Sequence, residues 1–217
     1  MRFALFAAVP VLAMLTLWVV WPRRSTGDVS ATLPAMKDAD PRNLKQATFA
    51  AGCFWGVEAS FRKVPGVVST EVGYTGGHTN NPTYHDVCTD LTGHAEAVLV
   101  TYDSTKVSYA ELLDAFWSSH DPTTLNQQGP DFGTQYRSAI FYHDDEQKKI
   151  AEASLKEVQA SKIFKSPIVT EIVKAGVFTK AEDYHQQYFE KTGGVCHVGP
   201  AVVHTALATE AAKARGK

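Results

Sequence analysis

Residues 48–62 read TFAAGCFWGVEASFR, and the type of secondary structure changes within this stretch. Residues 48–51 carry no charge and favour a short buried strand. Apolar side chains then recur at helical spacing, at Phe54, Val57 and Phe61. Pro65-Gly66 ends this pattern, because proline cannot continue a helix. The stretch therefore predicts a strand, a turn at Gly52-Cys53 and a helix over residues 54–62.

Strand and helix patterns alternate along the rest of the chain. Further strands are predicted over residues 67–74, 95–102, 138–142 and 169–173, and further helices over residues 109–120, 144–161 and 181–190. This order is a split β-α-β pattern and predicts an α+β fold, a ferredoxin-like two-layer sandwich with a mixed sheet and a long coil-rich C-terminal segment. Two polar stretches, residues 78–93 and 121–133, are predicted to be loops. Loops longer than about 12 residues are uncommon without a function, so a site is expected there.

The composition is that of an ordinary globular domain with extra segments. The chain has 217 residues, of which 44% are hydrophobic and 20% are charged, so a core of useful size is available. The formal net charge is -2, and no long basic run supports nucleic-acid binding. The three cysteines, Cys53, Cys88 and Cys196, are too few for a disulfide scaffold, and their odd number leaves at least one thiol free.

The N-terminal segment is strongly apolar. Residues 3–21 carry no charge and lie between Arg2 and the pair Arg23-Arg24. A membrane-spanning helix needs ~20 apolar residues, whereas the core of a signal peptide has about 7–15. The segment therefore favours an uncleaved membrane anchor over a cleaved export signal, and both over a buried core helix. Because arginines flank both ends, the orientation stays open; an exported, extracytoplasmic domain is preferred, with a cytoplasmic one as the alternative.

These patterns divide the chain into four parts. Residues 1–22 are predicted to be the membrane anchor or signal segment, and residues 23–44, rich in Ser, Thr, Asp, Pro and Ala, are predicted to be a flexible linker. Residues 45–200 are predicted to form the folded domain, and residues 201–217 an Ala-rich tail.

Cys53 lies where the first predicted helix begins. Backbone N–H groups at a helix start stabilise an anion, and they can raise the thiolate fraction above the roughly 3% expected of a free cysteine at pH 7. A small buried hydrophobe is an equally good interpretation of this position alone. Phe54 and Trp55 could line an apolar cup for a methyl or thioether group, although core packing is the commoner role of such residues. Gly52 either lets the backbone approach a ligand or only makes the turn.

The pentapeptide Gly52-Cys53-Phe54-Trp55-Gly56 resembles the signature of the A-type peptide methionine sulfoxide reductases. Further segments that resemble motifs of this family follow in order: GYTGG (73–77), NPTY (81–84), GHAEAV (93–98), DFGTQYRS (131–138) and EDYHQ (182–186). The resemblance covers roughly residues 45–200, the whole predicted domain. One pentapeptide is moderate evidence, but several motifs in the right order are strong evidence.

The resemblance implies an activity and roles for individual residues. It implies that Cys53 attacks methionine S-sulfoxide, free or in proteins, and that methionine is released. The other implied roles are general acid for Glu96, hydrogen-bond donors to the sulfoxide oxygen for Tyr84 and Tyr136, ordering of the surrounding network for Asp131, and substrate binding for Phe54, Trp55 and Gly52. Without the resemblance, Glu96 would be interpreted as a surface carboxylate, the tyrosines as core or rim residues, and Asp131 as a turn residue.

A general acid at position 96 needs an environment that keeps its proton. An exposed glutamate is only about 0.2% protonated at pH 7. Glu96 lies between Ala95 and Ala97 at the start of an apolar strand, and burial there raises a carboxyl pKa. We therefore expect Glu96 to face Cys53 across a small apolar pocket.

The attack leaves a sulfenic acid on Cys53, which a second thiol can convert to a disulfide. The resemblance implies that Cys196, which follows Gly193-Gly194-Val195, is this resolving thiol. It also implies that thioredoxin or a thioredoxin-like protein reduces a direct Cys53–Cys196 disulfide. Cys88 is expected to be structural, with a backup resolving role as the alternative. No bound cofactor or metal is expected, and the enzyme is expected to be a monomer that repairs oxidised proteins.

Three other functions are compatible with parts of the sequence. A zinc site would use residues among His78, His85, Cys88 and His94, whose spacing lacks the paired C-x2-C pattern of structural sites. A cysteine hydrolase would pair Cys53 with His185, but it leaves Glu96 and Cys196 without roles. A membrane-tethered binding domain would leave the whole set of reactive residues unexplained.

Overall fold

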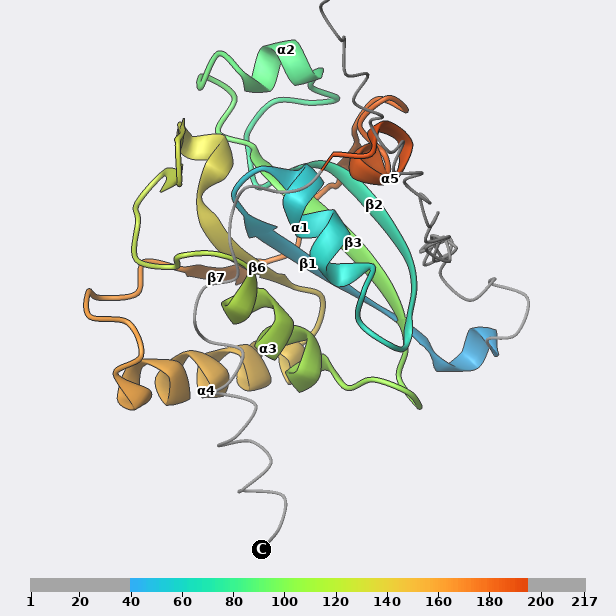
Figure 1. Ribbon diagram of the computed structural model, residues 1–217, viewed down its shortest axis with the longest axis vertical. Helices are drawn as coiled ribbons and strands as arrows, with labels where there is room; N and C mark the ends of the chain where they lie inside the picture. The colour runs from blue at the N-terminus through green and yellow to red at the C-terminus, as the bar shows by residue number, and fades with distance from the viewer. Residues whose placement is uncertain (1–39, 195–217) are drawn as a thin grey trace, which may run out of the picture. The chain divides into compact units, whose positions relative to one another are not determined.

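Strand β1 (Leu44–Ala51) lies near the centre of a six-stranded sheet in the computed structural model, which describes residues 40–194 (Figure 1). It pairs antiparallel with β3 (Ala95–Asp103) on one side and with β6 (Ser138–Tyr142) on the other. β2 (Val67–Thr75) pairs with the far side of β3. The short strands β7 (Glu171–Lys174) and β8 (Thr179–Lys180) complete the order β7-β6-β1-β3-β2-β8.

The connections make two interleaved split β-α-β units. Helix α1 (Phe54–Phe61) joins β1 to β2, and β3 lies between these two strands. Helix α3 (Tyr109–Ser119) is on the connection from β3 to β6, and β1 lies between that pair in turn. β6 and β7 run parallel while the other pairs are antiparallel, so the sheet is mixed. The predicted α+β, ferredoxin-like sandwich is therefore confirmed.

One face of the sheet carries the larger helices. α1 lies in front of the strands in Figure 1, with α3 and α4 (Asp145–Ser161) below it, and buried residues of all three helices belong to one core cluster with the strands. The core between the layers is aromatic: the Phe49 ring stacks on Phe61 at 4.9 Å and on Phe116 at 5.4 Å between ring centroids. All three rings are buried, and burial of each stabilises the fold by about 2 kcal/mol.

The opposite face of the sheet is lined by small residues. The residues that pack there are Ala50, Ala95, Ala97, Ala139 and Phe141, with Ala175 and Phe178 of the C-terminal segment against them. Successive side chains of a strand point to opposite faces. Because Ala95 and Ala97 belong to this face, Glu96 between them lies on the helix face, which is also the face of α1.

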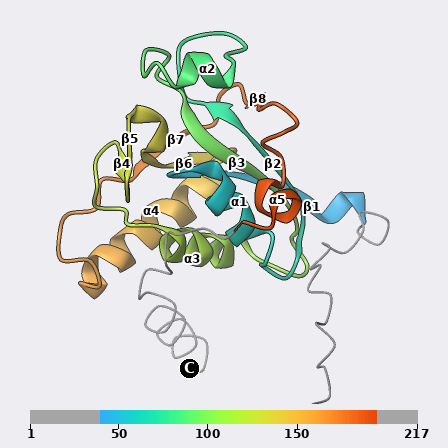
Figure 2. The same ribbon diagram turned by 45° about the horizontal axis from the view of Figure 1, so that its top comes forward.

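The first predicted loop, residues 78–93, contains a short helix, α2 (Tyr84–Val87), beyond the ends of β2 and β3 (Figure 2). A capping box explains where the helix begins. The Thr83 hydroxyl accepts the Asp86 N–H at 3.3 Å, and the Asp86 carboxylate accepts the Thr83 N–H at 2.9 Å. The prediction of an unbroken loop is wrong here, because a helix this short carries no apolar period.

The second predicted loop, residues 121–133, contains a hairpin of β4 (Gln127–Gln128) and β5 (Asp131–Phe132). The hairpin is fastened to the first loop by Asp90, whose carboxylate accepts the Thr134 N–H at 2.7 Å and also the Thr134 hydroxyl. The two segments in which a site was expected are therefore joined to one another.

The helix predicted over residues 181–190 is wrong in position. α5 covers Tyr188–Thr192, and Gln187 before it has a left-handed φ of 48°. Upstream, the Gln186 side-chain amide accepts the Val72 N–H and donates to the Val72 carbonyl, both at 2.9 Å. Bonds to the edge of the sheet thus hold this segment, and tertiary contacts override its local helical preference.

Other boundaries also differ from the prediction. β1 begins at Leu44 rather than at residue 48, and a 3-10 turn, Pro41–Asn43, occupies the end of the predicted linker. The last predicted strand is shifted to Glu171–Lys174, and the two-residue β8 was not predicted. The predicted anchor, Cys196 and the Ala-rich tail lie outside the described residues. Within residues 40–194, no helix is long and apolar enough to cross a membrane.

Candidate active site

Cys53 lies at the junction of β1 and α1, where it is the N-cap residue of the helix. Gly52 before it has a φ of +92°, a conformation that L side chains rarely adopt, so the turn requires a glycine. The Cys53 side chain is half-buried. The predicted position at a helix start is therefore correct.

Glu96 approaches this junction from β3. Its side chain is buried, with only 2% of the residue exposed. Its Oε2 atom accepts the backbone N–H of Phe54 at 3.0 Å. This bond joins the first residue of α1 to the sheet, and it brings the Glu96 carboxyl next to the residue that follows Cys53.

Glu96 has the protonation state that a general acid needs. Burial, with a smaller contribution from the Asp131 charge, raises its pKa to about 8, although the bond from the Phe54 N–H opposes the shift. At pH 7, a carboxyl with this pKa is protonated in roughly nine molecules of ten. A surface carboxylate, the interpretation that this position favours in isolation, does not fit its burial.

The pKa of the Cys53 thiol moves in the direction opposite to the one predicted from the helix start. Burial and then the Glu96 charge raise it to about 12, although the backbone N–H groups of Trp55 and Gly56 lower it. The Phe54 N–H is taken by Glu96, so it does not stabilise a thiolate. The resting pair at neutral pH is consequently a thiol beside a carboxylic acid.

Tyr84 and Tyr136 belong to the same group of interacting side chains. Burial, followed by the charges of Glu96 and Asp131, raises the pKa of Tyr136. Burial, followed by the Cys88 thiol, raises the pKa of Tyr84, and Glu96 adds to the shift. Both phenols therefore keep their protons at neutral pH and can donate hydrogen bonds.

Glu182 holds Tyr84 in place, and sequence reasoning gave this residue no role. Its Oε1 atom accepts the Tyr84 backbone N–H at 3.0 Å, and its Oε2 atom accepts the Tyr74 hydroxyl at 2.9 Å. One carboxylate thus ties the start of α2 to β2. The only signal in the sequence was that Glu182 opens the EDYHQ segment.

Phe54 and Trp55 form an aromatic wall with residues from the C-terminal segment. The Phe54 ring is buried and lies 5.1 Å from the His185 ring. The Trp55 indole stacks on Tyr188 at 3.8 Å and donates its N–H to His185 Nδ1 at 3.0 Å. Both residues thus pack in the fold, and Trp55 is only partly covered.

The same contacts bear on the hydrolase alternative. His185 Nδ1 is occupied by the Trp55 N–H, and burial lowers the pKa of this histidine. Tyr84 and Tyr184 pack on its ring at 4.5 and 4.1 Å between centroids. His185 is therefore a neutral member of the wall, and no contact in the described part of the chain pairs it with Cys53.

One of the histidines considered for zinc, His94, has other partners for both ring nitrogens. His94 Nδ1 accepts the Gly77 N–H at 3.2 Å, and its Nε2 bonds the Thr79 carbonyl at 2.9 Å, so neither nitrogen is left for a metal. Over residues 40–194, no group of three or more His, Cys, Asp or Glu side chains is arranged to hold a metal ion. Cys88 is exposed, at the end of α2 beside Tyr84.

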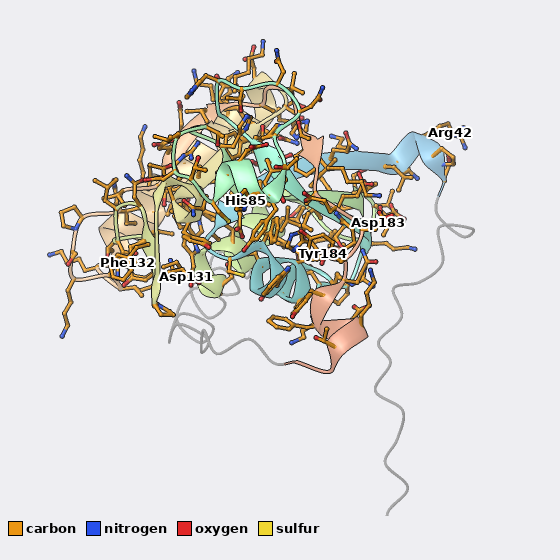
Figure 3. The ribbon with its side chains drawn as sticks, turned by 90° about the horizontal axis from the view of Figure 1, so that it is seen from above. Arg42, His85, Asp131, Phe132, Asp183 and Tyr184 are labelled. Atoms are coloured by element: carbon orange, nitrogen blue, oxygen red, sulfur yellow. The ribbon has the colours of Figure 1, made fainter. Side chains whose placement is uncertain are left out.

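Figure 3 shows which segments border the site from above. Asp131 and Phe132 of the hairpin lie on one side of His85 in α2, and Asp183 and Tyr184 of the C-terminal segment lie on the other. The charge of Asp131 raises the pKa of Cys53, Glu96 and Tyr136. The structure therefore brings together the predicted residues Cys53, Glu96, Tyr84, Tyr136 and Asp131, while Cys196 lies outside the described residues.

Comparisons with known proteins point to one family. The family model described as peptide methionine sulfoxide reductase matches residues 45–215, past the boundary predicted at residue 200. A peptide methionine sulfoxide reductase MsrA from Methanosarcina acetivorans is 64% identical over 150 residues, which cover 69% of this chain and 80% of the relative. Another, from Acidobacterium capsulatum, is 55% identical over 156 residues, covering 71% of this chain and 100% of the relative.

Solved structures give the same result. Reduced Mxr1 from Saccharomyces cerevisiae matches with a TM-score of 0.69 and 36% identity, covering 77% of this chain and 97% of that one. Methionine sulfoxide reductase A of Corynebacterium diphtheriae matches with a TM-score of 0.65 and 40% identity, covering 73% of this chain and 79% of that one.

Proposed function

We propose that this chain, which belongs to the A-type peptide methionine sulfoxide reductases, reduces the S epimer of methionine sulfoxide through Cys53. The substrate is methionine sulfoxide, free or in oxidised proteins, and the product is methionine. The observation that carries the proposal is the buried, protonated carboxyl of Glu96 beside the Cys53 thiol. A neutral acid at that place is what an oxygen-transfer reaction requires.

The chemical step moves one oxygen atom from the substrate sulfur to the Cys53 sulfur. Glu96 gives its proton to the sulfoxide oxygen, and the Cys53 sulfur attacks the sulfoxide sulfur as the thiol proton passes to the Glu96 carboxylate. The S–O bond of the substrate then breaks as the hydroxyl oxygen forms a bond to the Cys53 sulfur. Cysteine sulfur loses two electrons and the methionine sulfur gains them, so methionine leaves and Cys53 becomes a sulfenic acid. Because Glu96 donates a proton to the sulfoxide oxygen and accepts one from the Cys53 thiol, the step needs no other acid or base.

Two tyrosines assist this step. Negative charge that develops on the sulfoxide oxygen is stabilised by hydrogen-bond donors that are already in place. Tyr84 and Tyr136 supply these donors, since both phenols stay protonated. Phe54 and Trp55 receive the methyl group of the substrate, and Asp131 orders the polar network around it.

Resolution of the sulfenic acid falls to Cys196. Its thiol attacks the Cys53 sulfur, water leaves, and a Cys53–Cys196 disulfide forms, which thioredoxin or a related dithiol reduces by exchange. Support comes from α5, which precedes this segment: its Tyr188 ring stacks on the Trp55 indole of α1, two residues after Cys53, at 3.8 Å between ring centroids. The chain then leaves α5 through Gly193, at a φ of +69°. The segment that carries Cys196 therefore starts beside the helix that Cys53 caps.

Replacing Cys196 with serine should separate the two halves of the cycle. We expect Cys196→Ser to form one methionine per enzyme at the wild-type rate, because the variant keeps the oxygen-transfer residues. Steady-state turnover with thioredoxin should then stop, since no disulfide forms for thioredoxin to reduce. Rapid-quench measurement of methionine, followed by a thioredoxin-coupled assay, checks both expectations. Normal cycling of this variant would show that another thiol, such as Cys88, resolves the sulfenic acid.

Epimer selectivity tests the proposed activity itself. Single-turnover experiments with each purified epimer should give methionine from the S-sulfoxide only, because the acid and the two phenols meet the oxygen on one side of the sulfur. Reduction of neither epimer, or equal reduction of both, would contradict the proposed function.

The N-terminal anchor stays a prediction and is part of the proposal. The uncharged run over residues 3–21 supports a membrane-anchored or exported enzyme. A monomer with its catalytic domain outside the cytoplasm is part of the same proposal. Ultracentrifugation of cell extracts, compared with a chain that lacks residues 1–22, is the direct test. Recovery of the full-length enzyme entirely in the supernatant would argue against an anchor.

A further inference from the structure

Gln128 is a buried polar residue that the chemistry above does not use. Only 4% of it is exposed. Its Oε1 atom accepts the Asp121 N–H at 3.1 Å, and its Nε2 donates to the Asp121 carbonyl at 2.9 Å. The side-chain amide thus pairs with both polar groups of one backbone residue and closes the loop from residue 121 to residue 128.

The backbone at Asp121, to which the Gln128 amide bonds, lies next to a residue that is fixed in the core. His120, next to Asp121, is buried, and its ring bonds the Phe116 carbonyl at 3.0 Å and the Ser138 hydroxyl at 2.7 Å. Burial lowers the pKa of His120 to about 4, so the ring stays neutral and the two bonds persist at physiological pH. The backbone that Gln128 grips is therefore anchored to α3 and β6.

The aliphatic part of Gln128 packs on the turn that precedes Cys53. A methyl group added at Gly52 would lie 2.6 Å from Gln128 Cγ and 2.7 Å from its Cβ. Atoms this close to the Gln128 backbone cannot swing away as the end of a long side chain can. Gly52 therefore has a packing role of its own, which is to let the hairpin lie directly against the Cys53 turn.

Gln128 is also the cross-strand partner of Asp131. The two residues are paired in the β4–β5 hairpin, on either side of Gly129-Pro130. A displacement of Gln128 would consequently move Asp131. One residue thus touches the Cys53 turn through its side chain and the Asp131 strand through its backbone.

From this juxtaposition we infer that Gln128 is a positioning residue, which holds the Asp131 hairpin against the Cys53 turn and so sets where the Asp131 carboxylate lies relative to the reacting sulfur. The inference rests on the proposed function, since it assigns Gln128 to the same chemistry. Gln128 itself does not touch the substrate.

Two substitutions of Gln128 test the inference. Gln128→Met keeps the unbranched chain that packs on Gly52 but removes the amide that grips Asp121, and Gln128→Ala removes both. The matched control is Gln127→Ala, in the same strand, whose side chain donates to the Gly129 carbonyl at 3.1 Å. Asp131→Asn and the double variant Gln128→Met with Asp131→Asn complete the set. Circular dichroism and thermal melting show which variants fold.

The first readout is the single-turnover rate with methionine S-sulfoxide. Misplacement of a functional group by about 1 Å can lower a rate by roughly 100-fold, so we expect losses of about 10- to 100-fold for Gln128→Met. Gln127→Ala should stay near the wild-type rate. The double variant should be no slower than Asp131→Asn, because a carboxylate that is absent cannot be misplaced.

The second readout is the pKa of Cys53, measured by the ultraviolet absorbance of the thiolate. Gln128→Met should lower it toward the value of Asp131→Asn, and a residue with a merely structural role would leave it unchanged. Multiplicative losses in the double variant, or an unchanged thiol pKa in the Gln128 variants, would overturn the inference. If the wild-type enzyme reduced no methionine sulfoxide, the proposed function would fail instead, and the thiol titration would still decide the role of Gln128.

Discussion

Cys53→Ser should form no measurable methionine, in single turnover or in steady state. Sulfur accepts the oxygen because it can give up two electrons and become a sulfenic acid, and a serine hydroxyl has no comparable oxidation state. No other thiol in the described residues is beside Glu96, so we expect no substitute nucleophile. Loss of a sole nucleophile costs enzymes on the order of a million-fold in rate, which places the variant below detection. Methionine measured by mass spectrometry after overnight incubation is a sensitive check.

Cys88→Ser is the matched control for this experiment. It removes the exposed thiol at the end of α2 and leaves the Cys53 junction unchanged, so the first turnover should persist. Methionine formation by Cys53→Ser at more than a trace would mean that a different residue takes the oxygen, and the proposed chemistry would be wrong.

Glu96→Gln should slow the oxygen-transfer step by roughly 100- to 10,000-fold, the usual contribution of a general acid. Glutamine is nearly the same shape and can still accept the Phe54 N–H. It cannot give a proton to the sulfoxide oxygen or receive the thiol proton. The binding of substrate should change little, so the loss should appear in the single-turnover rate constant at saturating sulfoxide. Glu71→Gln, a carboxylate of β2 that pairs with Lys180 at 3.5 Å, is the surface control and should react at the wild-type rate.

The rate of oxygen transfer should also depend on pH in a definite direction. The acid form of Glu96 is the active one, and its pKa is about 8. The wild-type rate should therefore be high below pH 8 and fall as the pH rises through that value. Glu96→Gln has no such group and should show no fall in the same range. A profile that rises through pH 8 in the wild type, or persists unchanged in the variant, would contradict the acid role.

The same pKa shift predicts an effect on stability. A carboxyl whose folded pKa is raised stabilises the native state most below its unfolded pKa, near 4.5, and this contribution is lost as the pH rises toward 8. Glu96→Gln avoids the loss. The melting temperature of Glu96→Gln minus that of the wild type should therefore increase between pH 5 and pH 8. The increase should correspond to about a few kcal/mol in the free energy of unfolding.

The split β-α-β architecture could be predicted because its elements follow simple periods. Phe54, Val57 and Phe61 recur as helix positions should, and α1 was found where they predicted it. The face of Glu96 also follows from the alternation of Ala95, Glu96 and Ala97 along β3. Motif resemblance, and not periodicity, placed five residues in one site: Cys53, Glu96, Tyr84, Tyr136 and Asp131. Their separation along the sequence does not show how far apart they lie in the fold.

What could not be predicted depends on contacts between distant segments. The helix-start argument gave the wrong direction for the Cys53 pKa, because the sequence does not reveal that Glu96 takes the Phe54 N–H or that burial outweighs the remaining backbone groups. The helix over residues 181–190 failed because Gln186 bonds the edge of β2 instead. Gln128 and Glu182 went unassigned, since a single glutamine or glutamate carries no sequence pattern that shows which distant residues it bonds.

The most direct test is to count sulfenic acid against methionine in one turnover. Cys196→Ser enzyme would be mixed with one equivalent of methionine S-sulfoxide in the presence of a sulfenic-acid trapping reagent, and then digested for peptide mass analysis. We predict one trapped sulfenic acid at Cys53 for each methionine formed, and far fewer of both when Glu96 is also glutamine. Methionine formed while Cys53 stays an unmodified thiol would contradict oxygen transfer to this sulfur.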